Sequence, residues 1–127
     1  MNRLPKALSL ALVGLSACVT TNAVMLDPLA SYPPVPEAEI VVYVDEADVE
    51  AEFVKIALIY AEGDADLHDQ SQFVEAMRKK AAEIGAHAII LEDFEEPSTG
   101  ARVAEAILGT SAERRARVLA IRFVSPR

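Results

Sequence analysis

Residues 69–94 read DQSQFVEAMRKKAAEIGAHAIILEDF, and this stretch decides the fold. Asp69 is a good N-cap, and Gln72 three residues later completes a capping box, so we expect a helix to begin here. Apolar side chains then recur at helical spacing, as Phe73, Met77, Ala81 and Ile84. Gly85 stands where a left-handed C-cap is needed, and the strand-like run 86–94 follows at once. The stretch therefore predicts a helix that ends at Gly85 and lies back on the sheet that the next strand joins.

Three further segments have the pattern of strands. Residues 39–44 (EIVVYV) are β-branched and aromatic, while residues 53–61 (FVKIALIYA) and 114–124 (RRARVLAIRFV) alternate. One side of segment 53–61 is expected to carry Val54, Ile56, Leu58 and Tyr60. Residues 101–112 fit a strand, a short helix or a flexible hairpin arm. The order strand, strand, helix, strand, strand predicts an α+β fold of two layers, with one helix packed on a small, mostly antiparallel sheet.

The first eighteen residues, MNRLPKALSLALVGLSAC, have the parts of a secretory signal peptide. Two basic residues precede an apolar run over 7–15, and small residues close it. That run is too short to cross a bilayer, which needs about 20 apolar residues. LSAC resembles the lipobox of bacterial lipoproteins, in which the cysteine sulfur receives a diacylglycerol and the peptide is cut before the cysteine. The resemblance implies cleavage between Ala17 and Cys18, and acyl chains such as palmitate on Cys18.

The residue after the cysteine indicates in which membrane the mature lipoprotein is expected. Val19 stands where lipoproteins retained in the inner membrane of many Gram-negative bacteria carry Asp. By this resemblance, the mature protein of a Gram-negative organism is expected on the outer membrane, facing the periplasm. In another organism it would be membrane-anchored and extracytoplasmic. An ordinary signal peptide with a cysteine near the cut, or a buried amphipathic N-terminus, remains the alternative.

The pattern divides the chain into three parts. They are a lipoprotein signal peptide (1–17), the lipidated cysteine with a proline-rich tether (18–38), and the α+β domain (39–124). The prolines of the tether favour extended backbone, and about 18 residues at roughly 3 Å each would reach about 50 Å. The alternative is that part of this segment packs on the domain, since it also carries Val24, Met25, Leu26 and Leu29.

Charge and composition narrow the classes of function. The chain has a net charge of −8, and loss of residues 1–17 removes two basic residues, which leaves 10 basic against 20 acidic residues and a charge of −10. Such a body does not favour nucleic acid or anionic lipid by charge. Cys18 is the single cysteine, so a disulfide framework, a cysteine zinc site and a thiol nucleophile are excluded. The absence of Trp argues against an aromatic carbohydrate-binding surface.

The run KKAAEIGAHAIILEDF (79–94) supports a second resemblance. It resembles a stretch of small secreted lipoproteins, including families related to the Rcs outer-membrane stress-sensor lipoprotein and the YbjQ-type domain. Segments 53–63 and 118–123 resemble the flanking strands of those families. The Rcs sensor depends on disulfides that this chain cannot form, and no motif here supports the metal binding attributed to YbjQ-type domains. The resemblance therefore implies a fold and a lipoprotein context, without a reaction.

Two groups of polar residues are candidates for chemistry. Asp64, Asp66 and His68 could hold a divalent cation, although the spacing matches an EF-hand loop at one position alone. His87 could join His68 as a general base or ligand, but in a strand its ring is expected to face solvent or to bond a neighbour. These residues define the alternative function, a metal-binding or hydrolytic periplasmic domain.

The main basic patch predicted from the sequence follows the last connection. It consists of Arg114, Arg115, Arg117 and Arg122. In an acidic chain these arginines suggest docking of an acidic envelope protein, and the alternative is internal pairing with carboxylates. We therefore expect a lipid-anchored, non-enzymatic binding or stress-sensing module of the cell envelope. It would contact the membrane through Cys18, need no cofactor and bind no nucleic acid.

Overall fold

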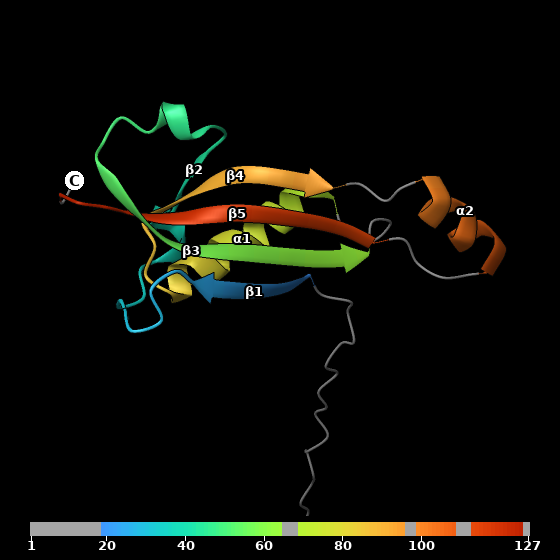
Figure 1. The fold of residues 1–127 in the computed structure, drawn as a ribbon, viewed down its shortest axis with the longest axis horizontal. Helices are drawn as coiled ribbons and strands as arrows, with labels where there is room; N and C mark the ends of the chain where they lie inside the picture. Colours follow the sequence, from blue (N-terminus) through green and yellow to red (C-terminus); the bar gives the residue numbers. More distant parts are fainter. Residues whose placement is uncertain (1–18, 65–68, 96–98, 109–112, 126–127) are drawn as a thin grey trace, which may run out of the picture.

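The computed structural model describes residues 19–64, 69–95, 99–108 and 113–125. One sheet and one helix make up the body, and a second helix stands beyond one end of the sheet (Figure 1). The elements in chain order are β1 (Thr20–Met25), η1 (Glu37–Glu39), β2 (Val41–Tyr43), η2 (Glu46–Asp48), β3 (Phe53–Asp64), α1 (Gln70–Glu83), β4 (Ala88–Glu95), α2 (Thr99–Leu108) and β5 (Glu113–Phe123).

The sheet has the strand order β1-β3-β5-β4-β2. β3 and β5 form its antiparallel centre, and β1 and β4 pair with them in antiparallel fashion. β2 alone runs parallel to its neighbour, β4. The structure thus confirms a two-layer α+β fold with a mostly antiparallel sheet, and it adds β1 and α2 to the predicted order of elements.

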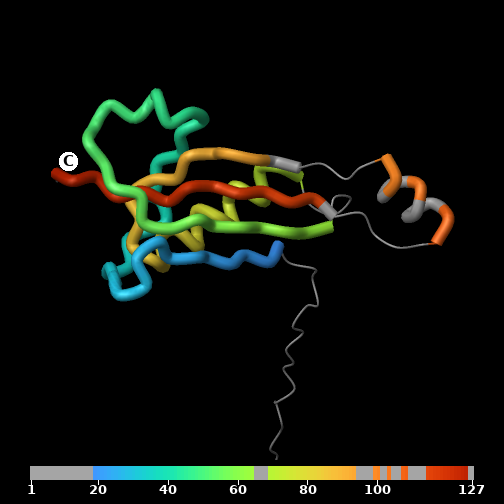
Figure 2. Tube along the Cα trace, viewed as in Figure 1, coloured from blue at the N-terminus to red at the C-terminus, as the bar shows by residue number. Residues whose placement is uncertain are grey.

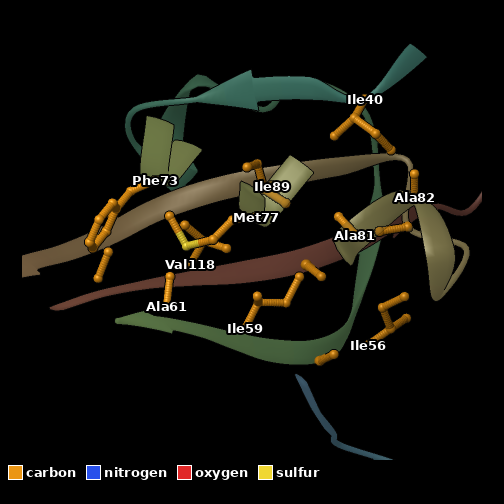
Figure 3. Packing of buried hydrophobic residues seen from close by; sticks show 14 residues of the cluster. Ile40, Ile56, Ile59, Ala61, Phe73, Met77, Ala81, Ala82, Ile89 and Val118 are labelled. Atoms are coloured by element: carbon orange, nitrogen blue, oxygen red, sulfur yellow. The ribbon is translucent and has the colours of Figure 1, made fainter. Parts of the chain in front are cut away.

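Helix α1 begins and ends as its sequence predicts. The Asp69 carboxylate accepts from the Gln72 backbone N–H at 3.0 Å, and the Gln72 side chain accepts from the Asp69 N–H at 2.8 Å, which completes the capping box. Gly85 has a φ of +83°. The stripe of Phe73, Met77 and Ala81 is buried against Ile59, Ala61, Ile89 and Val118 of the sheet (Figure 3). Burial of this apolar face holds the two layers together.

The other face of the sheet carries a second, smaller apolar cluster. Its buried members are Ala88, Ile90, Leu119, Ile121 and Phe123. The prediction that Val54, Ile56, Leu58 and Tyr60 share one side of segment 53–61 is wrong, because β3 has an irregularity between Lys55 and Ala57. Beyond it, Ala57 and Ile59 face α1, whereas Leu58 joins the second cluster and Tyr60 is partly exposed. A bulge of this kind moves every later side chain to the opposite face.

The predicted tether is wrong over the described residues from 19 onward, because this segment is part of the domain. Thr20–Met25 is strand β1, and the backbone N–H of Val35 donates to the Ala82 carbonyl at 2.9 Å. Residues of this segment also pass close over the C-terminus of α1. A Cβ atom on Gly85 would lie 2.5 Å from the Tyr32 Cβ and 2.7 Å from the Pro33 carbonyl oxygen. The domain therefore begins by residue 20, and the predicted reach of about 50 Å does not apply.

The ambiguous segment 101–112 proves to be helical up to Leu108, as part of α2. Figure 2 shows α2 beyond the end of the sheet at which β1 and β5 begin and β3 and β4 finish. In the part of the chain that the structure describes, no helix is long and apolar enough to span a bilayer.

Candidate functional site

Strand β1 forms one edge of the sheet. Among the described residues, β3 is its one neighbour in the strand order. The strand reads TTNAVM, without a charge, a proline or a glycine. Natural sheets protect long edges with charged residues, prolines or bulges, because unpaired N–H and C=O groups can bind another strand. β1 has none of these protections and is therefore a candidate for strand addition.

The register identifies which backbone groups face outward. Thr20 to Met25 pair with Glu62 to Ala57, and in the same register the N–H of Leu26 donates to the Ile56 carbonyl at 2.9 Å. In an antiparallel pair, alternate residues present both N–H and C=O to the same side. Positions 20, 22 and 24 therefore bond β3, and positions 21, 23 and 25 turn their N–H and C=O groups to the open edge.

A groove of about 820 Å³ runs between this edge and α1. Val19 and Thr21 form its strand side, and residues one and two turns apart on α1 form its helix side. The helix wall includes Gln72, Glu75, Ala76, Lys79 and Glu83. An open strand edge beside a helix-lined groove offers main-chain bonds on one side and side-chain contacts on the other.

The four predicted arginines do not form one patch. Strand alternation sends Arg115 and Arg117 to the helix-free face, and Arg114 and Arg122 to the face that carries α1. The Arg114 guanidinium lies 6.0 Å from the Phe73 ring centroid, at one end of α1. Arg122 lies at the other end, 4.6 Å from the Tyr32 ring centroid, where it also donates to the Gly85 carbonyl. A common acidic partner cannot contact all four at one surface.

Arg117 is paired within the domain. β4 has an irregularity between Leu91 and Asp93, which places two successive carboxylates near the same arginine. The Arg117 Nε lies 3.1 Å from Glu92 Oε2, and its Nη2 lies 3.3 Å from Asp93 Oδ2. Arg115 is exposed, between Glu62 of β3 and Glu95 of β4 in the register. Arg117 thus has the internal pairing with carboxylates of the alternative, whereas Arg122 contacts the Tyr32 ring and the Gly85 carbonyl.

His87 lies in a second groove of about 650 Å³, beside Val41, Arg122 and Phe123. Its Nδ1 accepts from the backbone N–H of Phe123 at 3.0 Å, and its ring stacks on the Phe123 ring at 5.8 Å. Burial, and then the positive charge of Arg122, lower the pKa of His87 below 6.5. The neutral ring with Nδ1 as acceptor carries its proton on Nε2, so neither nitrogen offers a lone pair to a metal or substrate in this arrangement.

The predicted metal residues lie mostly outside the described part of the chain. Asp66 and His68 belong to the segment 65–68, and Cys18 with the cleavage site also lies outside. Asp64 is at the end of β3, opposite Glu113 of β5. Within the described ranges, no three His, Cys, Asp or Glu residues are grouped closely enough to hold a metal ion.

Comparison with known proteins gives a likeness in fold alone. No protein-family model and no curated protein matches the chain. The crystal structure of the Francisella virulence factor FvfA, in its orthorhombic form, superposes with a TM-score of 0.56 and 16% sequence identity. The match covers 80% of this chain and 96% of that chain. At this identity, the likeness supports the architecture and leaves the function to be argued from the site.

Sequence reasoning missed the edge strand because the prolines that follow it dominated the interpretation of residues 19–38. A signal was present in TTNAVM, which combines β-branched residues with an alternation of Thr21, Ala23 and Met25 toward the core. The groove could not be predicted, because it depends on which strand lies at the edge under α1.

Proposed function

We propose that this protein is a lipid-anchored, non-enzymatic binding module of the cell envelope that takes an extended segment of a partner protein as a sixth strand beside β1. The observation that carries the proposal is the uncharged, six-residue edge of β1 next to the groove on α1. Anchoring rests on the lipobox-like LSAC at 15–18. The outer membrane, facing the periplasm, is the expected place in a Gram-negative organism.

The groove favours a partner segment with alternating character. Backbone groups of Thr21, Ala23 and Met25 would bond the segment, and every second side chain of the segment would enter the groove. There it would meet a wall of mixed charge, with Lys79 and Glu83 around Ala76. Small or polar side chains at the inward positions fit this wall better than a long acidic run. Main-chain bonding supplies affinity that does not depend on the charge of the partner.

A selection from a random peptide library on the full-length acylated protein tests this binding mode. The selected peptide is then measured against a Thr21→Pro variant, which removes an outward N–H but no bond to β3. We expect the affinity to fall about tenfold or more, as one lost hydrogen bond and a steric block imply. Thr21→Val keeps the N–H and the size of the side chain, so it should bind within about twofold of the native protein.

A further variant shows whether the partner binds at the edge of β1 or at the arginines of β5. Charge reversal of Arg115 and Arg117 to Glu changes the helix-free face and leaves the outward backbone groups of β1 intact. If the reversal abolishes binding while Thr21→Pro binds normally, the partner docks on the arginines and the edge proposal is wrong.

Intact-mass analysis of the protein from membranes, beside Cys18→Ser, tests the anchor separately. A mass without acyl chains on Cys18 would remove the anchor from the proposal.

A further inference from the structure

Helix α2 presents apolar side chains to its surroundings. In the described part of the chain, no other helix or strand packs extensively against it. Val103, Ile107 and Leu108 are 49%, 73% and 71% exposed. Val103 and Ile107 are four residues apart and share one side of the helix, and Leu108 widens this apolar surface next to Ile107. Figure 1 shows α2 beyond the end of the sheet, clear of both its faces. Singly exposed apolar residues need no explanation, but a stripe on one helix that stands away from the domain indicates a contact surface.

The same end of the sheet carries the start of β1. Thr20 pairs with Glu62 of β3, and Glu62 pairs with Arg115 of β5, close to where the chain returns from α2. Cys18 lies two residues before Thr20, so the chain between them spans at most about 7 Å. The acyl chains of Cys18 would therefore hold this end of the domain, and with it α2, at the membrane surface.

We infer that α2 lies in the membrane interface and seats Val103, Ile107 and Leu108 among the lipids, as a second contact beside the acylated Cys18. This inference rests on the anchor of the proposed function and names the partner of α2. Amphipathic helices of this kind bury their apolar face roughly 5–10 Å into the headgroup region. Two contacts at one end fix the strands upright on the bilayer and leave the groove of β1 accessible from the side.

The charges near this end indicate whether electrostatic attraction or apolar burial holds α2 at the membrane. Arg114 and Arg115 lie there on β5, and Glu62 and Asp64 lie on the neighbouring β3. Glu113 of β5 and Glu95 of β4 lie at the same end in the register, so carboxylates outnumber the arginines and attraction to anionic lipid contributes little. Seating should therefore depend on the apolar stripe and change little with salt.

Fluorescence from a single introduced tryptophan tests the inference, because the chain has no Trp of its own. Ile107→Trp and, as the control, Val44→Trp are made in the full-length acylated protein. Val44 is also 73% exposed, but it follows β2, which pairs with the first residues of β4, whereas α2 comes after the last residue of β4. Each variant is reconstituted in vesicles of phosphatidylethanolamine and phosphatidylglycerol with or without bromine on the acyl chains. Vesicle flotation and intact mass are recorded on the same samples.

We expect brominated lipid to quench the fluorescence of the Ile107→Trp variant at least twofold more than that of Val44→Trp, with little change between low and high salt. Equal quenching of the two variants in vesicles that carry the acylated protein would overturn the inference and leave the anchor intact. A blue shift of the Ile107→Trp emission without bromine quenching would also overturn it, and would indicate a second copy of the chain on α2. Failure to float, with an unmodified Cys18, would instead contradict the anchor on which the inference depends.

Discussion

The two edges of the sheet are built differently. β1 is six residues long, carries no charge and borders a groove, whereas β2 is three residues long and runs into an acidic connection. That connection contains Asp45, Glu46 and Asp48 around a short 3-10 turn. Short strands and adjacent charges are the usual protection against pairing with another chain. The difference shows that this fold closes one edge and leaves the other available.

The connection between the two edge strands is itself held by contacts with the rest of the domain. Residues 26–40 carry the chain from β1 to β2 and pass over Gly85, whose positive φ and lack of a Cβ admit Tyr32 and Pro33. Arg122 on the Tyr32 ring and the Val35 bond to Ala82 hold the same segment.

The largest effect is expected from Gly85→Ala. The new Cβ would clash with the Tyr32 Cβ at 2.5 Å, and the residue would adopt a strained backbone, so we expect a loss of about 2–4 kcal/mol in the free energy of unfolding. Chemical denaturation measures it. Gly63→Ala is the control, since Gly63 in β3 has no positive φ, and it should cost less than about 1 kcal/mol. Equal costs at the two positions would show that the close approach of Tyr32 does not constrain the fold.

The next effect compares neighbouring residues of β1. Asn22→Pro removes an N–H that bonds β3 and leaves the opposite carbonyl without its donor, so it should cost about 1–3 kcal/mol. Thr21→Pro removes an outward N–H and should cost less than about 1 kcal/mol. Thermal unfolding of both variants checks the order. A larger loss for Thr21→Pro would reverse the assignment of the open edge.

The smallest effect is expected at the β2 edge when the pH is lowered. His87 holds β2 through its carbonyl, which accepts from the Val41 N–H at 3.2 Å. Burial and Arg122 lower the pKa of His87, so the unfolded chain binds the proton more tightly than the folded one. The stability that neutral His87 contributes is complete above about pH 6.5 and is lost as the pH falls from there toward the folded pKa. Amide exchange at Val41 should accelerate over this window, while exchange at Asn22 changes less.

His87→Asn provides the control for that prediction. Its amide oxygen can still accept from the Phe123 N–H, but it has no proton to gain in this range. The variant should show the same exchange rate at Val41, corrected for intrinsic exchange, on both sides of pH 6.5. If the acceleration at Val41 persists in His87→Asn, another group causes it.

The sequence was most informative where several local signals agreed. Around α1, the cap at Asp69, the apolar stripe and the glycine at Gly85 each matched the structure. Patterning failed where a backbone irregularity intervened, since the bulge at Ile56 moved Leu58 away from the face that simple alternation assigned to it together with Ile56. The arginines show a different limit. Alternation along β5 divides the four positions between two faces, but the partners of Arg117 and Arg122 come from distant segments.

The edge strand was hidden for a different reason. Its pairing with β3 joins residues about 40 positions apart, as in Thr20 with Glu62, and such contacts leave no mark in local spacing. The candidate site therefore depends on topology, whereas the proposed anchor rests on a local motif, LSAC at 15–18.

Amide hydrogen exchange of the full-length protein, with and without a peptide selected on it, tests the central claim most directly. The account predicts that Thr21, Ala23 and Met25 exchange fast in the free protein and become protected when the peptide binds. Asn22 and Val24 should be protected in both states, because β3 already bonds them. Peptide binding that leaves Thr21, Ala23 and Met25 unprotected would contradict strand addition at β1.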